Sequence, residues 1–275
     1  MYTFIDSIED LAFLNKELIN KPFVGVDTEF RRTSKDNMRL ALLQINDGEE
    51  IYLIDTISIL DPKEEVSFLF SASVVKIFHS CKEDLEAIFS WTNSKMVNIF
   101  DTQLANSFLH DDYSISYQGL VEKSLGITLE KKETRSNWVR RPLSDEQLKY
   151  AALDVEYLIY LYLEQKKDLT NKNKLNWLNE DIDQLIKVTF KPNLTFNELS
   201  RTIPRGQEID LLSKFNEVVE GIAYREGINS TLFFSKKVQK YFLRLVLIEG
   251  IEMACNEITN WRRKLIKDEL LSILQ

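Results

Sequence analysis

Five side chains in three separated stretches have the types and spacing needed for metal-dependent chemistry. Asp27 and Glu29 stand two residues apart, Asp84 lies some fifty residues later, and Tyr150 and Asp154 stand one helical turn apart. Carboxylate oxygens are ligands for hard cations such as Mg²⁺ or Mn²⁺. Two such ions about 3.5–4 Å apart stabilise both the attacking and the leaving oxygen of a phosphoryl transfer. If the fold gathers these groups, the sequence predicts two-ion phosphodiester chemistry.

The first carboxylate pair follows an apolar run that is typical of a buried strand. Side chains alternate along a strand, so Phe23, Gly25, Asp27 and Glu29 share one face, where Gly25 is expected to leave the surface open. Two adjacent carboxylates repel one another and are stabilised by a cation. A strand that simply ends in solvent explains the pair equally well.

The other carboxylates also have ordinary explanations. Asp84 falls in the first turn of an expected helix, where a negative charge is favourable next to the helix dipole. Tyr150 could donate a hydrogen bond to Asp154 on an exposed helix face. Neither Asp84 nor Asp154 has a Lys or Arg three or four residues away, so no intrahelical ion pair accounts for them. Only a constellation of all four would favour catalysis.

Three segments resemble the sequence motifs of the DEDD 3′–5′ exonucleases. They are Asp27-Thr28-Glu29-Phe30, His79-Ser80-Cys81-Lys82-Glu83-Asp84-Leu85-Glu86 and Tyr150-Ala151-Ala152-Leu153-Asp154. The sister subgroup has a histidine five residues before the last Asp, where this chain has Lys149, so the chain is similar to the tyrosine subgroup (DEDDy). The segments 100–103, 133–138 and 141–144 resemble those of the ribonuclease D family.

The resemblance implies both a fold and a set of roles. The fold would be α/β, a ribonuclease H-like mixed β-sheet flanked by helices. Asp27, Glu29 and Asp154 would hold one ion, Mg²⁺ or Mn²⁺, and Asp27 with Asp84 would hold the second. Tyr150 would orient the attacking water, since a tyrosine pKa near 10 makes it a poor base at neutral pH. The products would be nucleoside 5′-monophosphates released from a 3′ end.

Five further residues are candidates for substrate binding, and three of them have a structural alternative. Gln44 lies on a strand near Asp27, and it could equally be an ordinary strand glutamine. His79 could be a core histidine. Arg135 and Trp138 could stack on a 3′ nucleotide, although Trp138 could instead anchor its loop. Arg141 could contact a phosphate.

The bulk properties restrict the partners less than the motifs do. The net charge of −8 disfavours a nucleic-acid partner, but residues 191–275 carry 13 Lys and Arg against 11 Asp and Glu, whereas the rest is strongly acidic. We expect RNA as the substrate, by family analogy tRNA precursors. A DNA exonuclease or a catalytically inactive RNA-binding module are the alternatives. We also expect a cytoplasmic monomer that does not enter a membrane, with Cys81 and Cys255 as buried thiols.

The elements that must position these residues can be read from their patterning. Strands are expected near 22–30, 39–45, 50–54, 74–78 and 97–100, and helices over 82–91 and 144–165. Ser144 and Gln147 form a capping-box pattern just after Pro142. The expected domains are an exonuclease domain at 1–190, a linker at 191–207 and a helical domain at 208–275.

The last segment, from Trp261 to Leu274, is similar to the end of the second helicase-and-RNase-D C-terminal (HRDC) domain of the ribonuclease D family. Members of the ribonuclease D family often carry two such domains, and this chain has room for one HRDC-like domain. Lys236, Lys237, Lys240 and Arg244 recur at helical spacing. They could follow a phosphate backbone, or they could be a solvated helix face.

Overall fold

The computed structural model divides into two compact units, each with its own core. Unit 1 comprises Met1–Leu104 and Ile115–Lys167, and unit 2 comprises Ala105–Ser114 and Asp168–Gln275. The structure describes residues 2–34, 37–62, 64–129, 136–190 and 199–274. No helix within these ranges has both the length and the apolar character needed to cross a bilayer.

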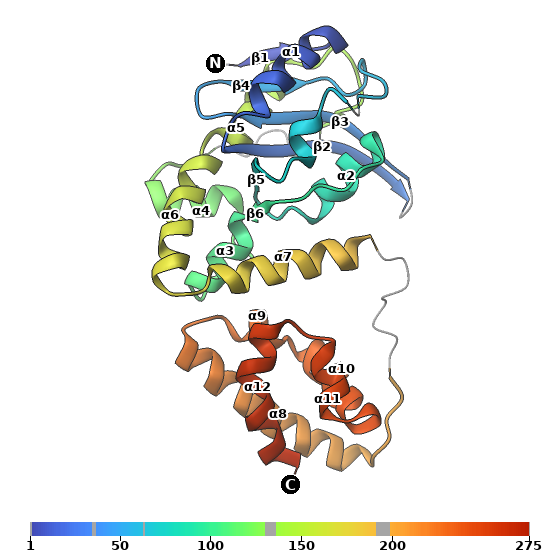
Figure 1. Cartoon of the computed structure of the whole chain (residues 1–275), viewed down its shortest axis with the longest axis vertical. Helices are drawn as coiled ribbons and strands as arrows, with labels where there is room; N and C mark the ends of the chain where they lie inside the picture. The colour runs from blue at the N-terminus through green and yellow to red at the C-terminus, as the bar shows by residue number, and fades with distance from the viewer. Residues whose placement is uncertain (1, 35–36, 63, 130–135, 191–198, 275) are drawn as a thin grey trace. The chain divides into compact units, whose positions relative to one another are not determined.

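Unit 1 is built on a mixed six-stranded sheet (Figure 1). Its strands are β1 (Thr3–Ile5), β2 (Phe23–Ser34), β3 (Asn37–Asn46), β4 (Ile51–Ile54), β5 (Val75–Phe78) and β6 (Ile99–Asp101), in the spatial order β1-β4-β3-β2-β5-β6. β2, β3 and β4 pair antiparallel, whereas β1 with β4, and β5 with both β2 and β6, pair parallel. The predicted mixed sheet is therefore confirmed, including the hairpin between β3 and β4.

The helices complete both units. In unit 1 they are α1 (Ile8–Leu18), a 3₁₀ helix (Ser67–Phe70), α2 (Lys82–Thr92), α4 (Tyr117–Leu125) and α5 (Asp145–Glu156). α3 (Thr102–Leu109) and α6 (Leu158–Asn171) have residues in both units. In unit 2 they are α7 (Leu175–Thr189), α8 (Arg205–Glu226), α9 (Ser230–Phe234), α10 (Lys236–Glu249), α11 (Ile251–Asn256) and α12 (Asn260–Leu274). The predicted helical C-terminal region is confirmed.

Strand β2 lies inside the sheet and presents a different set of residues to each side. Thr28 faces α2, where its hydroxyl donates a 2.5 Å hydrogen bond to Asp84. Gly25 lies on the other side, against the start of α6. Asn46, directly opposite Gly25 on β3, donates from its amide to the Val155 and Glu156 carbonyls at the end of α5. The sheet is thus covered by α2 on one face and by α5 and α6 on the other.

The helix predicted over 144–165 is interrupted, which corrects the sequence-based expectation. The capping box at Ser144 and Gln147 is confirmed, but α5 ends at Glu156 and α6 starts at Leu158. The Tyr117 hydroxyl donates to the Leu153 carbonyl at 3.2 Å and accepts from the Tyr157 backbone N–H at 3.0 Å. These are the two groups that would bond each other in a continuous helix, so the inserted hydroxyl explains the break.

The core of unit 2 joins α7 to the last helix of the chain. Trp177 on α7 stacks on Trp261 of α12, with ring centroids 4.9 Å apart and planes 10° from parallel. Asp181, also on α7, accepts a 2.8 Å hydrogen bond from the Trp261 indole and forms an ion pair with Arg262. The domain limits 1–190, 191–207 and 208–275 remain predictions, and residues 191–198 of the expected linker lie outside the described residues.

Candidate active site

Three of the predicted carboxylates and the predicted tyrosine line one hollow in unit 1. Asp27 and Glu29 enter it from β2, and Tyr150 and Asp154 enter it from α5. The hollow has a volume of about 240 Å³, and its remaining walls are His79, Tyr117 and Gln118. Residues more than a hundred positions apart in the sequence therefore meet at one place. An isolated strand end or an isolated helix face would not bring them together.

Gly25 has a different role from the one expected. A Cβ atom added there would lie 3.2 Å from the Leu158 Cβ, which is closer than side chains normally pack. The glycine therefore lets the first turn of α6 approach β2. It does not leave the strand surface open beside Asp27, and the space for a ligand lies further along the strand.

The turn between β5 and α2 places the fourth carboxylate. Ser80 has a left-handed backbone with φ of 68°, a conformation that is uncommon for a residue other than glycine. The Asp101 carboxylate stabilises this turn by accepting the backbone N–H groups of Ser80 at 3.0 Å and Cys81 at 2.8 Å. α2 begins directly after the turn. Asp84 is consequently held in its first turn, buried and bonded to Thr28.

The two carboxylates of β2 are strongly perturbed. Burial, followed by the charges of Asp84, Asp154 and Glu29, raises the pKa of Asp27 well above its usual value. Burial and the charges of Asp154 and Asp84 raise the pKa of Glu29 to about 9. Asp27 and Glu29 therefore lie close enough to Asp84 and Asp154 for their charges to interact.

The pKa values of the site residues on α2 and α5 are also raised. Burial raises the pKa of Asp84 to about 7, although the hydrogen bond from Thr28 acts in the opposite direction. Burial likewise raises the pKa of Asp154 to about 7, opposed by a hydrogen bond from the Tyr150 hydroxyl. Burial and the nearby charges of Asp154 and Glu29 raise the pKa of Tyr150, so this phenol is protonated at neutral pH.

The donor set fits a hard divalent cation. All four acidic groups offer oxygen, and a cation among them would offset the repulsion that, together with burial, raises the pKa values of Asp27 and Glu29. In the described part of the chain, no three His, Cys, Asp or Glu side chains are already arranged as a metal site.

Two of the predicted substrate-binding residues are buried. Gln44 is the cross-strand neighbour of Asp27, but its side chain is fully enclosed and is not open to a substrate. Trp138 is also buried and packs against the Tyr150 ring, with centroids 6.2 Å apart. Its alternative interpretation, as the anchor of its loop, fits the structure better. Arg135 lies outside the described residues.

The other two substrate-binding candidates have structural partners. Arg141 forms a double hydrogen bond with the Asp55 carboxylate, at 2.8 and 2.5 Å, and also donates to the Trp138 carbonyl. Its guanidinium therefore ties the loop before α5 to the sheet instead of facing a phosphate. Both ring nitrogens of His79 are engaged, with the Thr102 hydroxyl and the Ile115 carbonyl at 2.9 Å each, although the ring lines the hollow.

Several residues of the site were not among the predicted ones. Tyr117 and Gln118 line the hollow from the start of α4, Thr28 holds Asp84, and Asp101 holds the turn before α2. Thr28 and Asp101 lie inside the motif segments that carried the family resemblance. Tyr117 has no such signal, because its role depends on a contact with a helix some forty residues later.

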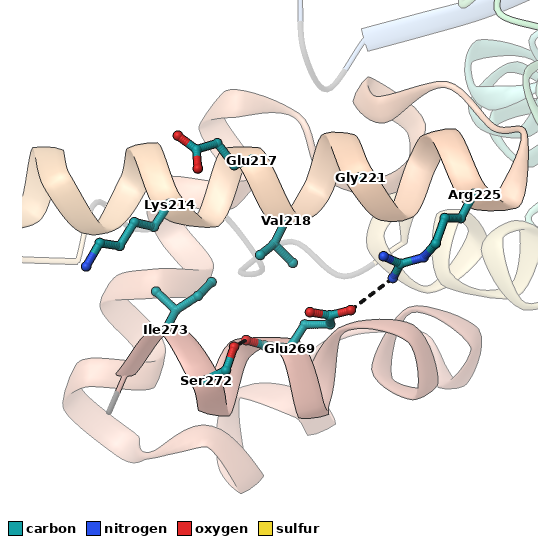
Figure 2. A pocket seen from close by; sticks show the side chains of 8 residues that line it. All are labelled: Lys214, Glu217, Val218, Gly221, Arg225, Glu269, Ser272 and Ile273. Carbon is teal, nitrogen blue, oxygen red and sulfur yellow. Dashed lines mark hydrogen bonds and ion pairs between the residues drawn. The ribbon is translucent and has the colours of Figure 1, made fainter.

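A larger hollow in unit 2 lacks this chemistry. It lies between α8 and α12 and has a volume of about 490 Å³ (Figure 2). Its lining mixes both signs of charge, and Arg225 and Glu269 form an ion pair across it at 3.0 Å. The predicted basic stripe of α10 is also partly neutralised, because Arg244 pairs with the buried carboxylate of Glu208. The hollow in unit 1 is therefore the candidate active site because of the side chains that line it, although the hollow in unit 2 is larger.

Comparison with known proteins agrees with this choice. A family profile described as 3′-5′ exonuclease matches residues 2–170, which is more than half of the chain and includes every residue of the carboxylate cluster. The chain belongs to the 3′–5′ exonuclease family. Within that family it is similar to ribonuclease D of Pseudomonas paraeruginosa, with 39% identity over 176 residues that cover 64% of this chain and 46% of the relative. The chain spans about half the length of the curated relatives it matches.

Solved structures of exonucleases share the fold. The crystal structure of Escherichia coli RNase D, an exoribonuclease involved in structured RNA processing, covers this entire chain with a TM-score of 0.68 at 23% identity, and 74% of that structure is matched. The Brucella melitensis protein NrnC with bound Mg²⁺ covers 69% of this chain and is itself matched over 93%, with a TM-score of 0.56 at 22% identity. One solved structure that shares this fold thus contains a magnesium ion.

Proposed function

We propose that this member of the 3′–5′ exonuclease family is a metal-dependent exoribonuclease of the ribonuclease D type. One observation carries the proposal, namely that Asp27, Glu29, Tyr150 and Asp154 line a single hollow. Burial and the charges of the neighbouring carboxylates raise the pKa values of Asp27 and Glu29, so a bound cation would be favourable there. The preference for RNA over DNA rests on the similarity to ribonuclease D sequences.

The proposed ligands divide into two overlapping sets. Asp27, Glu29 and Asp154 would hold one Mg²⁺ or Mn²⁺ ion, and Asp27 together with Asp84 would hold a second. Bound there, divalent ions supply a lowered pKa for the attacking water and neutralise charge on the phosphate and leaving oxygens. Thr28 orients Asp84 through its 2.5 Å hydrogen bond, so it acts as a positioning residue for the second ligand set.

Tyr150 acts in this scheme as a hydrogen-bond donor and not as a base. Its pKa is raised by burial and by the Asp154 and Glu29 charges, so its hydroxyl keeps its proton. It can therefore hold the attacking water in line with the last phosphodiester bond. The water oxygen bonds to phosphorus as the bond to the 3′ oxygen breaks, and that oxygen takes up a proton. The products are a nucleoside 5′-monophosphate and a strand shortened by one nucleotide.

A digestion assay tests the proposal directly. Purified protein with Mg²⁺ should shorten a 5′-labelled RNA stepwise from its 3′ end, and excess EDTA should abolish the reaction. Asp27→Asn should reduce the rate by a factor of a hundred or more, because it removes a ligand that both ions share. Asp168→Asn, which changes an exposed carboxylate on α6, is the matched control and should retain full activity.

The same assay distinguishes the alternatives. Activity that survives EDTA would contradict the metal mechanism, and an inert wild-type protein that still binds RNA would favour a binding module. Hydrolysis rates of matched RNA and DNA oligomers show which substrate the enzyme prefers. Faster hydrolysis of DNA would contradict the exoribonuclease proposal and favour a DNA exonuclease. A tRNA precursor with 3′ extra nucleotides is our proposed natural substrate, and it should be trimmed by the protein acting as a monomer.

A further inference from the structure

Two arginines face each other across the hairpin formed by β2 and β3. The register pairs Arg31 directly with Arg39, and both side chains are exposed. Like charges directly opposite each other in a ladder are destabilising. Neither guanidinium has a hydrogen-bond or ion-pair partner among the residues that the structure describes. The pair therefore costs stability without any visible compensation inside the protein.

Strand alternation places this arginine pair on the face of the carboxylate cluster. Asp27, Glu29 and Arg31 are successive odd positions of β2, so their side chains share one face. Arg32 supports the assignment because it points to the other face, where it pairs with Glu83 and Glu86 of α2. The register between β2 and β3 shifts once between Glu29 and Phe30, and after that shift Arg39 lies opposite Arg31.

The distance between the arginine pair and the carboxylate cluster suits a phosphate of the bound strand. Strands advance roughly 3.4 Å per residue, so the Arg31 backbone lies about 7 Å beyond that of Glu29. An arginine side chain presents a planar fork of N–H donors that matches two oxygens of one phosphate. A phosphate between the two guanidinium groups would neutralise their repulsion, as a counterion does.

We propose that Arg31 and Arg39 bind a backbone phosphate of the nucleic-acid strand, upstream of the phosphate at the carboxylate cluster. The inference rests on the proposed function, since it takes the cluster as the position of the 3′ end. A phosphate contact carries no base information, so the pair contributes affinity and register and not sequence preference. It also supplies local positive charge in a chain whose net charge is −8.

Chain length of the substrate provides the test. A dinucleotide has one phosphodiester group, which occupies the cluster, whereas an octanucleotide extends to the arginine pair. For R31Q combined with R39Q, the ratio of kcat/KM for the octanucleotide to that for the dinucleotide should fall about tenfold, through KM. The plot of log KM against log salt concentration should also lose about 0.7 from its slope, the value for one phosphate contact of a single strand.

R32Q is the matched control, because it removes the same charge from the adjacent position on the opposite face. It should lower the melting temperature by breaking the pair with Glu86 but should leave the octanucleotide-to-dinucleotide ratio unchanged. R31Q with R39Q should not lower the melting temperature, since it removes a repulsion. An unchanged ratio and salt slope in the double variant, with an active wild-type enzyme, would overturn the inference alone. If R32Q lowered the ratio as much as the double variant does, the inference would also be overturned. An inactive wild-type protein would overturn the proposed function and this inference with it.

Discussion

At the scale of single residues, the site is dominated by buried carboxyl groups. Burial and the charges of Asp154 and Asp84 raise the pKa of Glu29 to about 9, and burial raises the pKa of Asp154 to about 7. The pKa of each group is higher in the folded chain than in the unfolded one. The folded protein without metal therefore binds more protons than the unfolded protein between about pH 4 and pH 9.

This difference predicts how stability depends on pH. In EDTA, the melting temperature should fall by several degrees between pH 6 and pH 9, because the folded cluster is forced to ionise while the unfolded carboxyls already are charged. Each pKa unit corresponds to about 1.4 kcal/mol, and a kcal/mol shifts the melting temperature by roughly 2–4 °C in a chain of this size. Adding Mg²⁺ at pH 8 should reverse the fall. Differential scanning calorimetry is the measurement.

Asp27→Asn supplies the control for this titration, because it removes the charge that interacts with all the other acids of the cluster. Its melting temperature in EDTA should vary less with pH and exceed that of the wild type at pH 8. A wild-type melting temperature that is constant from pH 6 to pH 9, and that does not respond to Mg²⁺, would mean that the carboxylates do not interact as the structure indicates.

At the scale of elements, the orientation of Asp154 depends on the break between α5 and α6. The Tyr117 hydroxyl occupies the gap and bonds to the Leu153 carbonyl, directly before Asp154. The Tyr117 ring itself is held by an edge contact with His79, at 5.8 Å between centroids. We therefore propose Tyr117 as a positioning residue, which acts through the helix backbone on Asp154, a proposed metal ligand.

Tyr117→Phe should therefore affect catalysis more than substrate binding. Without the hydroxyl, the Leu153 carbonyl and the Tyr157 N–H lose their partners, at a cost of about 1–3 kcal/mol, or bond each other and straighten the helix. Either outcome moves Asp154. We expect kcat for RNA to fall about tenfold with little change in KM, and the Mg²⁺ concentration for half-maximal activity to rise. Tyr160→Phe, at a half-exposed position on α6, is the control and should change neither value.

The sequence was sufficient for elements whose pattern is local. Alternation along β2 placed Asp27 and Glu29 on one face, and the Ser144 capping box marked the start of α5. It was insufficient where a distant side chain decides the outcome. The helix breaks at Tyr157 because the Tyr117 hydroxyl bonds there. Arg141 is held by Asp55, which lies 86 residues away in the sequence. Such contacts leave no periodic signal in the local sequence.

At the scale of the whole molecule, the packing of α7 involves the last helix of the chain. α7 falls within the segment 1–190 that the sequence assigns to the exonuclease domain, a limit that stays a prediction, and its Trp177 and Asp181 pack against α12 within unit 2. The apolar stripe of an amphipathic helix indicates that the helix packs against another element, but it does not identify that element. Residues 168–190 accordingly need the C-terminal helices to complete their core.

Trp261 provides the test of this dependence. Its side chain is 2% exposed and contacts Trp177 and Phe108, with centroids 4.9 and 5.4 Å apart. Trp261→Ala should cost roughly 3–5 kcal/mol of unfolding free energy, because it opens a cavity and leaves the Asp181 carboxylate with one donor fewer. Urea unfolding, followed by circular dichroism, measures the loss. Tyr224→Ala removes an aromatic ring that is 89% exposed on α8 and should leave the midpoint unchanged. Equal midpoints for both variants would mean that α7 does not depend on α12 for its packing.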